Sequence, residues 1–373
     1  MALNSNVFGS VGTPRIFIDY VQFCKATNVP ISYYQWAGVG GDGVQTMSGD
    51  FKEVWNMNPA KTTYSDSAWS DGNDDETTDD DHYWTRWGIE IAKDTSIRGI
   101  QKLLSSANYY AILGHNFGDI TLNDTYINVI DEGGDYSNAG FTESEYSPNS
   151  HIYNWNGYRI KLVAPKIASD SGLEQNRGYL IRLNSDGAEF AATPQVGAIS
   201  VGRYMDMPNS PDLNLNVNYD YDGISRKRTI GGSDVVNVSY SSPPNWIGRY
   251  RPFTNSEEST SIGYNGRRSF ELSFSYIAHD SVFPQNFNDR FLFSNYVSPS
   301  DDDEFGNLFS AAKKESILSH FYTLTLGGTI PFIFQPDKTK DDFAICRLDK
   351  SSFTAKQVAH QTYDVSMTFV ETW

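Results

Sequence analysis

The chain has 373 residues, of which 14% are aromatic, and its formal net charge is −17. That length suggests two or three domains, each large enough to bury a core without disulfide bonds. A surface this acidic repels nucleic acid and anionic membranes, so the charge argues against a protein that binds DNA by neutralising its phosphates.

The first half of the chain contains short apolar segments separated by turn residues, a pattern typical of a β-sandwich or jelly roll. In Tyr158–Leu162, large apolar residues alternate with cations, which predicts a strand with one buried and one solvated face. The predicted strands cover residues 15–23, 31–36, 109–113, 120–129, 158–163, 178–183 and 196–203.

Two stretches between these strands have a different character. Residues 38–81 are rich in Gly, Asp, Ser and Thr and are expected to form loops. After Asp94, which is suited to cap a helix N-terminus, apolar residues fall on one helical face. The predicted short helix carries Ile97, Ile100, Leu103 and Leu104.

Proline, glycine, asparagine and aspartate are frequent in residues 205–246. This composition predicts a connector, and its interleaved tyrosines would suit packing over a neighbouring domain. We therefore expect a jelly-roll domain at 1–207, a connector at 208–246 and a second domain at 247–373.

The last third of the chain has the clearest periodicity. Apolar and polar residues alternate over 269–276, which predicts a half-buried strand. Helical spacing of apolar residues predicts an amphipathic helix over 304–325, with three aspartates before it and Gly327-Gly328 after it. With strands at 330–334 and 363–369, this order predicts an α+β domain, a split barrel or β-sandwich with one flanking helix.

Two motifs that resemble functional sites are better explained as structure. Gly38–Gly43 matches the dinucleotide-binding fingerprint, but the residues after it lack the apolar stripe of a helix that would hold a pyrophosphate. His115 follows a predicted strand and has no nucleophile nearby in a catalytic context, so we expect it to hydrogen-bond neighbouring backbone. No cofactor and no catalytic residue is predicted.

Seven carboxylates crowd residues 71–82. Their oxygens could bind calcium, but the EF-hand pattern fails because Glu76 stands at the glycine position and His82 at the final glutamate position. Like charges this close favour a solvated loop. The metal ligands that stay open as an alternative are Asp71, Asp75, Asp79 and Asp81.

Three tryptophans, Trp69, Trp84 and Trp87, are candidates for stacking on a sugar, although core packing is the commoner use of tryptophan. A glycosidase needs two positioned carboxylates, and 46 acidic residues give no way to single out a pair. A glycan-binding module is therefore an alternative to a purely structural protein, and an enzyme is not expected.

Two parts of the chain resemble a family when they are taken together. Ala107–Phe117, which contains Gly114-His115-Asn116, resembles a core segment of the galactose-binding-like jelly rolls of phage tail proteins. Strands similar to the later ones of that pattern follow in the same order, at Tyr158–Ile160 and Ile199–Arg203. Arg268–Phe274, the predicted helix and Gly327–Asp337 resemble the assembly domain of phage distal-tail and minor-tail proteins.

This resemblance implies a structural protein of a tailed-phage virion that forms a ring at or near the tail tip. Its expected partners are copies of itself, other tail proteins and, in the alternative, a host surface glycan. DNA would pass the ring only as cargo, and an acidic wall would keep that DNA from sticking.

The expected location is the virion tail, assembled in the host cytoplasm. The first residues have neither the basic nor the apolar region of a signal peptide, and no stretch approaches the roughly 18 apolar residues that a membrane helix needs. The only two cysteines, Cys24 and Cys346, could form a disulfide bond, but so few cysteines favour reduced thiols, which we expect.

Overall fold

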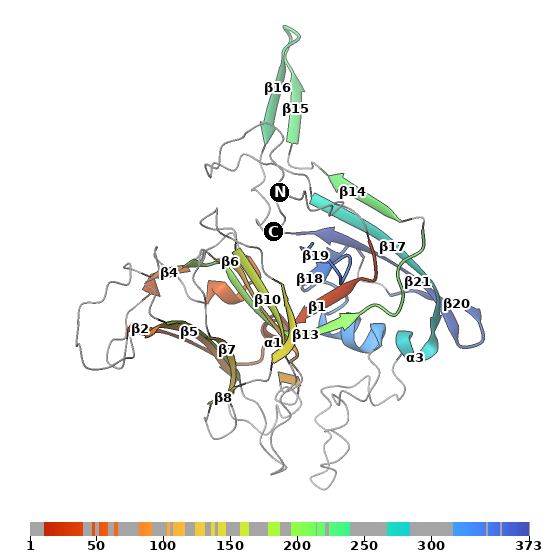
Figure 1. The fold of residues 1–373 in the computed structure, drawn as a ribbon. Coiled ribbons are helices and arrows are strands. Elements are labelled where there is room, and N and C mark those ends of the chain that lie inside the picture. Colours follow the sequence, from red (N-terminus) through yellow and green to blue (C-terminus); the bar gives the residue numbers. More distant parts are fainter. Residues whose placement is uncertain are drawn as a thin grey trace, which may run out of the picture.

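The computed structural model is mainly β, with antiparallel sheets and few helices (Figure 1). This confirms the predicted fold class of a mainly β chain with a flanking helix. The structure describes residues 11–39, 47–48, 52–58, 63–65, 82–91, 103–104, 107–115, 124–130, 136–138, 141–146, 157–163, 178–186, 195–213, 215–220, 224–238, 267–283, 316–340, 342–350 and 353–372.

The largest sheet has eleven strands and draws them from both ends of the chain. Every pairing in it is antiparallel. Its strand order is β14 (Asn216–Asp220), β17 (Arg267–Ala278), β21 (Thr362–Glu371), β19 (Ala344–Leu348), β18 (Phe332–Gln335), β1 (Arg15–Asp19), β13 (Ala198–Asp206), β6 (Tyr109–His115), β10 (Gly157–Val163) and β9 (Phe141–Tyr146), with β20 (Ala355–Ala359) paired to β21.

A second sheet shares a core with the first. Tyr179 and Ile89 of this sheet belong to the same buried cluster as Tyr110 and Ile112 of β6, which gives a sandwich. Its strands, in order, are β2 (Ile31–Val39), β5 (His82–Ile91), β11 (Gly178–Asp186), β7 (Asp124–Ile130) and β8 (Tyr136–Asn138). Two small sheets complete the described strands: β12 (Gln195–Val196), β4 (Thr63–Ser65) and β3 (Met47–Ser48) in one, β15 (Ile224–Arg228) and β16 (Asp234–Val238) in the other.

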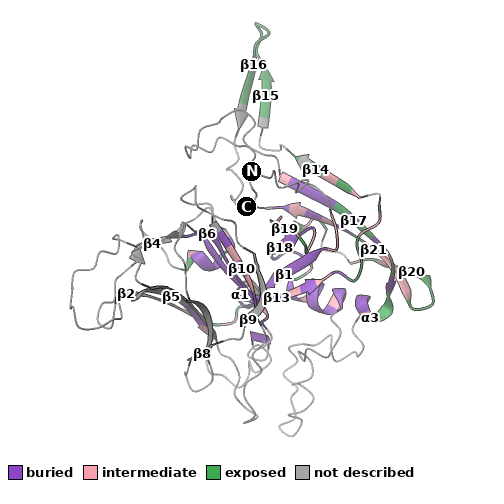
Figure 2. Ribbon diagram, in the orientation of Figure 1, coloured by how far each residue is buried: buried purple, intermediate pink, exposed green. Residues whose placement is uncertain are grey.

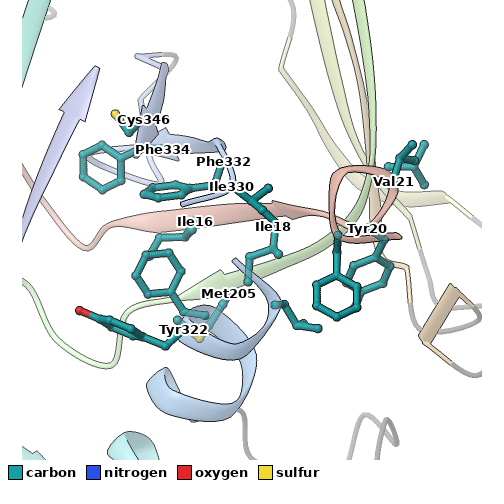
Figure 3. Close-up of a cluster of buried hydrophobic side chains, with 14 of the residues drawn as sticks. Ile16, Ile18, Tyr20, Val21, Met205, Tyr322, Ile330, Phe332, Phe334 and Cys346 are labelled. Atoms are coloured by element: carbon teal, nitrogen blue, oxygen red, sulfur yellow. The ribbon is translucent and has the colours of Figure 1, made fainter. Parts of the chain in front are cut away.

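Strand β1 joins the N-terminal and C-terminal parts of the large sheet. It pairs with β13 on one side and with β18 on the other, and all five of its residues are buried. Figure 3 shows Ile16 and Ile18 of this strand among side chains from the last third of the chain, including Phe332. The predicted boundaries at 207 and 247 remain a prediction. The large sheet takes strands from all three predicted segments: β1 from the first, β14 from the connector and β18 from the last.

The predicted strand over 15–23 is wrong beyond Asp19. Residues Tyr20–Ala26 form helix α1, because the Asp19 carboxylate accepts hydrogen bonds from the amides of Val21 and Gln22 and so caps its N-terminus. The apolar residues that seemed to extend the strand lie on one helical face instead, and the buried ones are Tyr20, Val21, Phe23 and Cys24.

The predicted helix over 304–325 is wrong at Ser316, where it is interrupted. Ser316 has extended backbone angles and its side chain accepts a hydrogen bond from the Ser319 amide, so the helix η4 (Ile317–Tyr322, of π type) begins directly after it. Its Phe321 packs edge-on against Phe332 and Phe369 and is completely buried. The predicted helical residues Phe305, Leu308, Phe309 and Ala312 lie outside the described residues.

Other predicted strands are confirmed with adjusted ends, at β2, β6, β7, β10, β11, β13, β17, β18 and β21. Sequence patterns missed the three strands β14, β15 and β16 within the predicted connector and the short strands β3 and β4 within the predicted loop stretch. They also missed β5, β8, β9, β19 and the exposed strand β20. The stretch predicted as loop contains the short helix η1 (Glu53–Trp55), whose Val54 and Trp55 are completely buried. A single apolar turn inside a polar stretch has no periodicity that would reveal it.

Candidate functional site

The sequence-predicted binding residues fall into two groups. Trp84 and Trp87 lie on β5, between β2 and β11 in the second sheet, and Gly38 and Gln35 of β2 are their respective neighbours across the strand pair. Trp69 and the four candidate metal ligands, Asp71, Asp75, Asp79 and Asp81, lie outside the described residues. Glycan contact and metal binding by these residues therefore remain predictions.

His115 ends strand β6 and is buried. Burial, together with the nearby Arg159, lowers its pKa to about 3, and it hydrogen-bonds the backbone of Tyr158. The imidazole is therefore neutral at ordinary pH. Its hydrogen bond to the backbone at the end of the strand is the structural role predicted for it. The first residues of the glycine motif, Gly38 and Val39, end strand β2, and the rest of the motif lies outside the described residues.

A buried carboxylate occupies the junction between β1 and α1. Asp19 is completely buried and accepts hydrogen bonds from the amides of Val21 at 2.7 Å and Gln22 at 3.1 Å. Burial raises the pKa of Asp19 to about 6, although these hydrogen bonds and the Ser200 hydroxyl oppose the shift. The Ser200 hydroxyl lies 2.8 Å from the Tyr109 hydroxyl, so a short polar chain crosses the core here.

A second buried polar group lies at the start of η4. The Ser319 hydroxyl is 3.0 Å from Nδ1 of His320, a spacing that would suit a nucleophile and its base. The Ser316 hydroxyl, however, lies 2.5 Å from the Ser319 hydroxyl and accepts a hydrogen bond from the Ser319 amide, so Ser316 caps the helix and the serine pair has a structural role. Burial and the nearby Arg203 lower the pKa of His320 to about 3, which keeps its imidazole neutral.

A third group links β17 to β21. Arg268 is 3% exposed and donates to the Asp342 carboxylate at 2.8 Å and to the Phe343 carbonyl at 2.6 Å. Its backbone amide donates to Glu371, whose carboxylate also lies 3.4 Å from the guanidinium. Burial lowers the pKa of Arg268, but the two carboxylates raise it by more. The guanidinium therefore stays charged in the buried site, where these carboxylates pair with it.

The β15–β16 hairpin differs from these buried groups because its described residues are exposed to solvent. Its turn is fixed locally: the Thr229 amide donates to the Ser233 carbonyl at 2.8 Å, and the Gly232 amide donates to the Thr229 carbonyl at 2.9 Å. Gly232 has φ +85°, the left-handed conformation that a three-residue hairpin loop requires and that glycine adopts without strain. This turn places Ile230 at the tip.

The hairpin extends away from both large sheets (Figure 1). Figure 2 colours the described residues of the hairpin as exposed, and residues 225–236 are all in that class. They include three large apolar side chains, since Ile230 is fully exposed and Val235 and Val236 are more than half exposed. Val235 and Val236 are adjacent on one strand and so point to opposite faces. Neither face of the hairpin therefore has a described cover.

The charge of the hairpin is opposite to that of the whole chain. Arg226, Lys227 and Arg228 are consecutive on β15, and Asp234 is the one acidic residue of the two strands. The formal net charge of the chain is −17, so the hairpin is a cationic element on an acidic protein. Exposed apolar side chains rimmed by cations suit a protein surface that offers a pocket with acidic edges.

Comparison of the chain with known protein families, with curated proteins and with solved structures finds no match. Within the described residues, no helix is long and apolar enough to cross a membrane. The same part of the chain contains no group of three or more His, Cys, Asp or Glu side chains that could hold a metal ion. Cys24 and Cys346 are free, buried thiols, as predicted.

Proposed function

We propose that this chain is a structural component of a tailed-phage virion, a distal or minor tail protein that assembles with its own copies into a ring at the tail tip. It would be assembled in the host cytoplasm and would act by contact rather than by catalysis. The observation that carries the proposal is the β15–β16 hairpin, which exposes Ile230, Val235 and Val236.

Exposed apolar side chains on a two-stranded hairpin favour association. A hairpin of two strands is marginally stable in water on its own, and covering its faces would add the stability that it lacks. Burying one isoleucine side chain contributes about 1.5–3 kcal/mol. A rigid turn that holds Ile230 at the tip also reduces the entropy lost on docking.

Charge favours a second copy of this chain as the partner. The hairpin carries three cations against one anion, whereas the chain as a whole is strongly acidic. A hairpin docking on a neighbouring copy would therefore meet opposite charge, and repetition of this unlike-to-unlike contact closes into a ring when the rotation between copies allows it. An acidic ring would also suit passage of DNA without binding.

The oligomeric mass tests this proposal. Light scattering coupled to size-exclusion chromatography should give a multimer for the wild type, and Ile230→Asp should shift the mass towards the monomer. Charge reversal of Arg226 and Lys227 to Glu should act in the same direction and more strongly at low salt. Lys356→Glu on the exposed strand β20 is the matched control and should leave the mass unchanged.

Labelling in particle images completes the test. A tag inserted after Gly231 should appear at the tail tip of assembled virions or, if the hairpin is covered, should prevent incorporation. A wild-type chain that stays monomeric at every concentration and is absent from purified virions would refute the proposal.

A further inference from the structure

A surface corner at the far end of β17 from the hairpin combines backbone strain with exposed polar and aromatic groups. Strand β14 pairs its last residue, Asp220, with Arg267 at the beginning of β17, and the hairpin follows β14. Tyr276 lies nine residues further along β17, about 30 Å away at strand spacing. The corner is therefore separate from the proposed assembly element.

Tyr276 occupies a β-bulge. Phe274 pairs with Val365 and Ile277 pairs with Tyr363, so two residues of β17 stand opposite one residue of β21. Tyr276 has φ +58°, in the left-handed region that glycine adopts in bulges of this kind and that a bulky side chain avoids. Its amide is held by the Asp364 carboxylate at 3.1 Å.

The strain is not offset by burial of the ring. Tyr276 is 75% exposed, so its side chain gains little from packing. Glycine in this place would satisfy the same backbone without strain and would leave no apolar ring in water. A strained residue that presents an aromatic ring to solvent is a feature typical of binding sites, where the conformation aims the side chain at a partner.

The groups around Tyr276 come from three elements. The short helix α3 (His279–Val282) follows β17, and the His279 amide donates to the Gln361 carbonyl at 2.9 Å in the turn between β20 and β21. Nδ1 of His279 lies 3.3 Å from the Tyr363 hydroxyl. Gln361 also has a left-handed backbone, with φ +54°. Two of the described non-glycine residues with positive φ thus lie at this one corner.

We propose that this corner is a saccharide-binding site with the Tyr276 ring as its platform. One face of a sugar ring presents C–H groups that pack on an aromatic ring, while its hydroxyls need donors and acceptors at the edges. The corner supplies both kinds of group: the Asp364 carboxylate accepts a hydrogen bond from the Tyr276 amide, and His279 and Gln361, which are joined by a backbone hydrogen bond, are both exposed.

The composition of the corner favours a small hydroxylated ligand over a protein partner. A stable protein interface buries about 800 Å² on each side around an apolar centre. In the described part of the corner, the large exposed apolar side chains are Tyr276 and Val358 of β20, and Val358 is only 39% exposed. A site with one aromatic ring and several hydrogen-bonding groups fits a sugar unit instead.

This site is independent of the proposed ring assembly, and one variant tests it without disturbing the fold. Tyr276→Gly removes the ring and relieves the strain, so its thermal unfolding midpoint should equal or exceed that of the wild type. Tyr276→Phe keeps the ring and is the matched control. The wild type should bind on an array of bacterial-surface glycans, and the strongest glycan should then be titrated against each variant by calorimetry.

We expect Tyr276→Gly to weaken binding of that glycan about tenfold or more and Tyr276→Phe to stay within about threefold, because the stacking contact is lost only in the first. Trp84→Ala tests the alternative site, in which the glycan contacts lie on β5. The proposal is overturned if no glycan binds, if Tyr276→Gly binds like the wild type while keeping its fold, or if Trp84→Ala abolishes binding instead. It is also overturned if the Tyr276 ring becomes protected on self-association, because a second copy would then be its partner.

Discussion

Replacement of Asp19 by asparagine should make the protein more stable at neutral pH. The carboxylate is completely buried, and burial raises its pKa from 3.8 to about 6. A difference of about two pKa units corresponds to about 3 kcal/mol between the charged and neutral forms. Asparagine is isosteric, carries no charge and is as good a helix cap as aspartate, so Asp19→Asn removes the cost of the buried charge and keeps the hydrogen bonds to α1.

The pH dependence has a definite sign. Because the pKa of Asp19 is higher in the folded than in the unfolded chain, the folded state binds more protons between pH 4 and pH 6, and this group's contribution to stability falls as the pH rises through that window. The advantage of Asp19→Asn should therefore be near zero below pH 4, grow between pH 4 and pH 6, and stay at about 3 kcal/mol above pH 6.

Urea unfolding followed by tryptophan fluorescence, repeated from pH 4 to pH 8, measures this difference as a shift of the midpoint at constant slope. Asp19→Ala is the companion variant: it lacks the cap and should be about 1 kcal/mol less stable than Asp19→Asn at every pH. A wild type that is more stable than Asp19→Asn at pH 7, or a difference that does not change with pH, would show that the buried charge is not costly and that the reasoning is wrong.

Four other substitutions test the core and the buried ion pair by the same unfolding assay. Arg268→Leu leaves Glu371 buried without its cation and should cost about 3–5 kcal/mol, whereas adding Glu371→Gln should recover much of that loss; equal stability of the two variants would contradict the pairing. Gly202→Ala should cost about 1–3 kcal/mol, because a Cβ there meets the Ile18 carbonyl where β13 pairs with β1, and a neutral effect would argue against that register. Phe321→Ala should cost about 3–5 kcal/mol through the cavity it leaves between η4 and the large sheet, and a cost below 1 kcal/mol would place the ring at the surface.

Local patterns predicted many strands because side-chain alternation repeats every two residues. Phe270, Leu272 and Phe274 are buried on one face of β17, as their spacing predicts. The same alternation places Tyr276 on that face, which is wrong, because the bulge shifts the register and leaves Tyr276 75% exposed. The same reasoning failed at Asp19, where apolar residues continue from a strand into a helix and a single capping aspartate decides the change. It also failed at Ser316, where the pattern predicts helix but the backbone is extended and the side chain caps η4.

The candidate sites were harder to predict than the strands. The hairpin was hidden in a stretch whose prolines and glycines indicated a connector, although Gly231-Gly232 between two short runs of valine, isoleucine and cations is a recognisable turn signal. Nothing in the sequence around Tyr276 marks a bulge, because the extra residue is defined by the strand opposite it. The exposure of these side chains could be known only once the sheet had been built.

The sequence alone determined the mainly β class, the faces of many strands and the acidic net charge, since each depends on composition or on neighbours a few residues away. Tertiary structure decided which strands meet. The placement of β1 between β13 and β18 joins segments more than a hundred residues apart, and the pairing of β17 with β21 brings Arg268 to Glu371 and creates the bulge at Tyr276. Such pairings depend on the packing of the whole core, because any strand edge offers the same backbone hydrogen bonds.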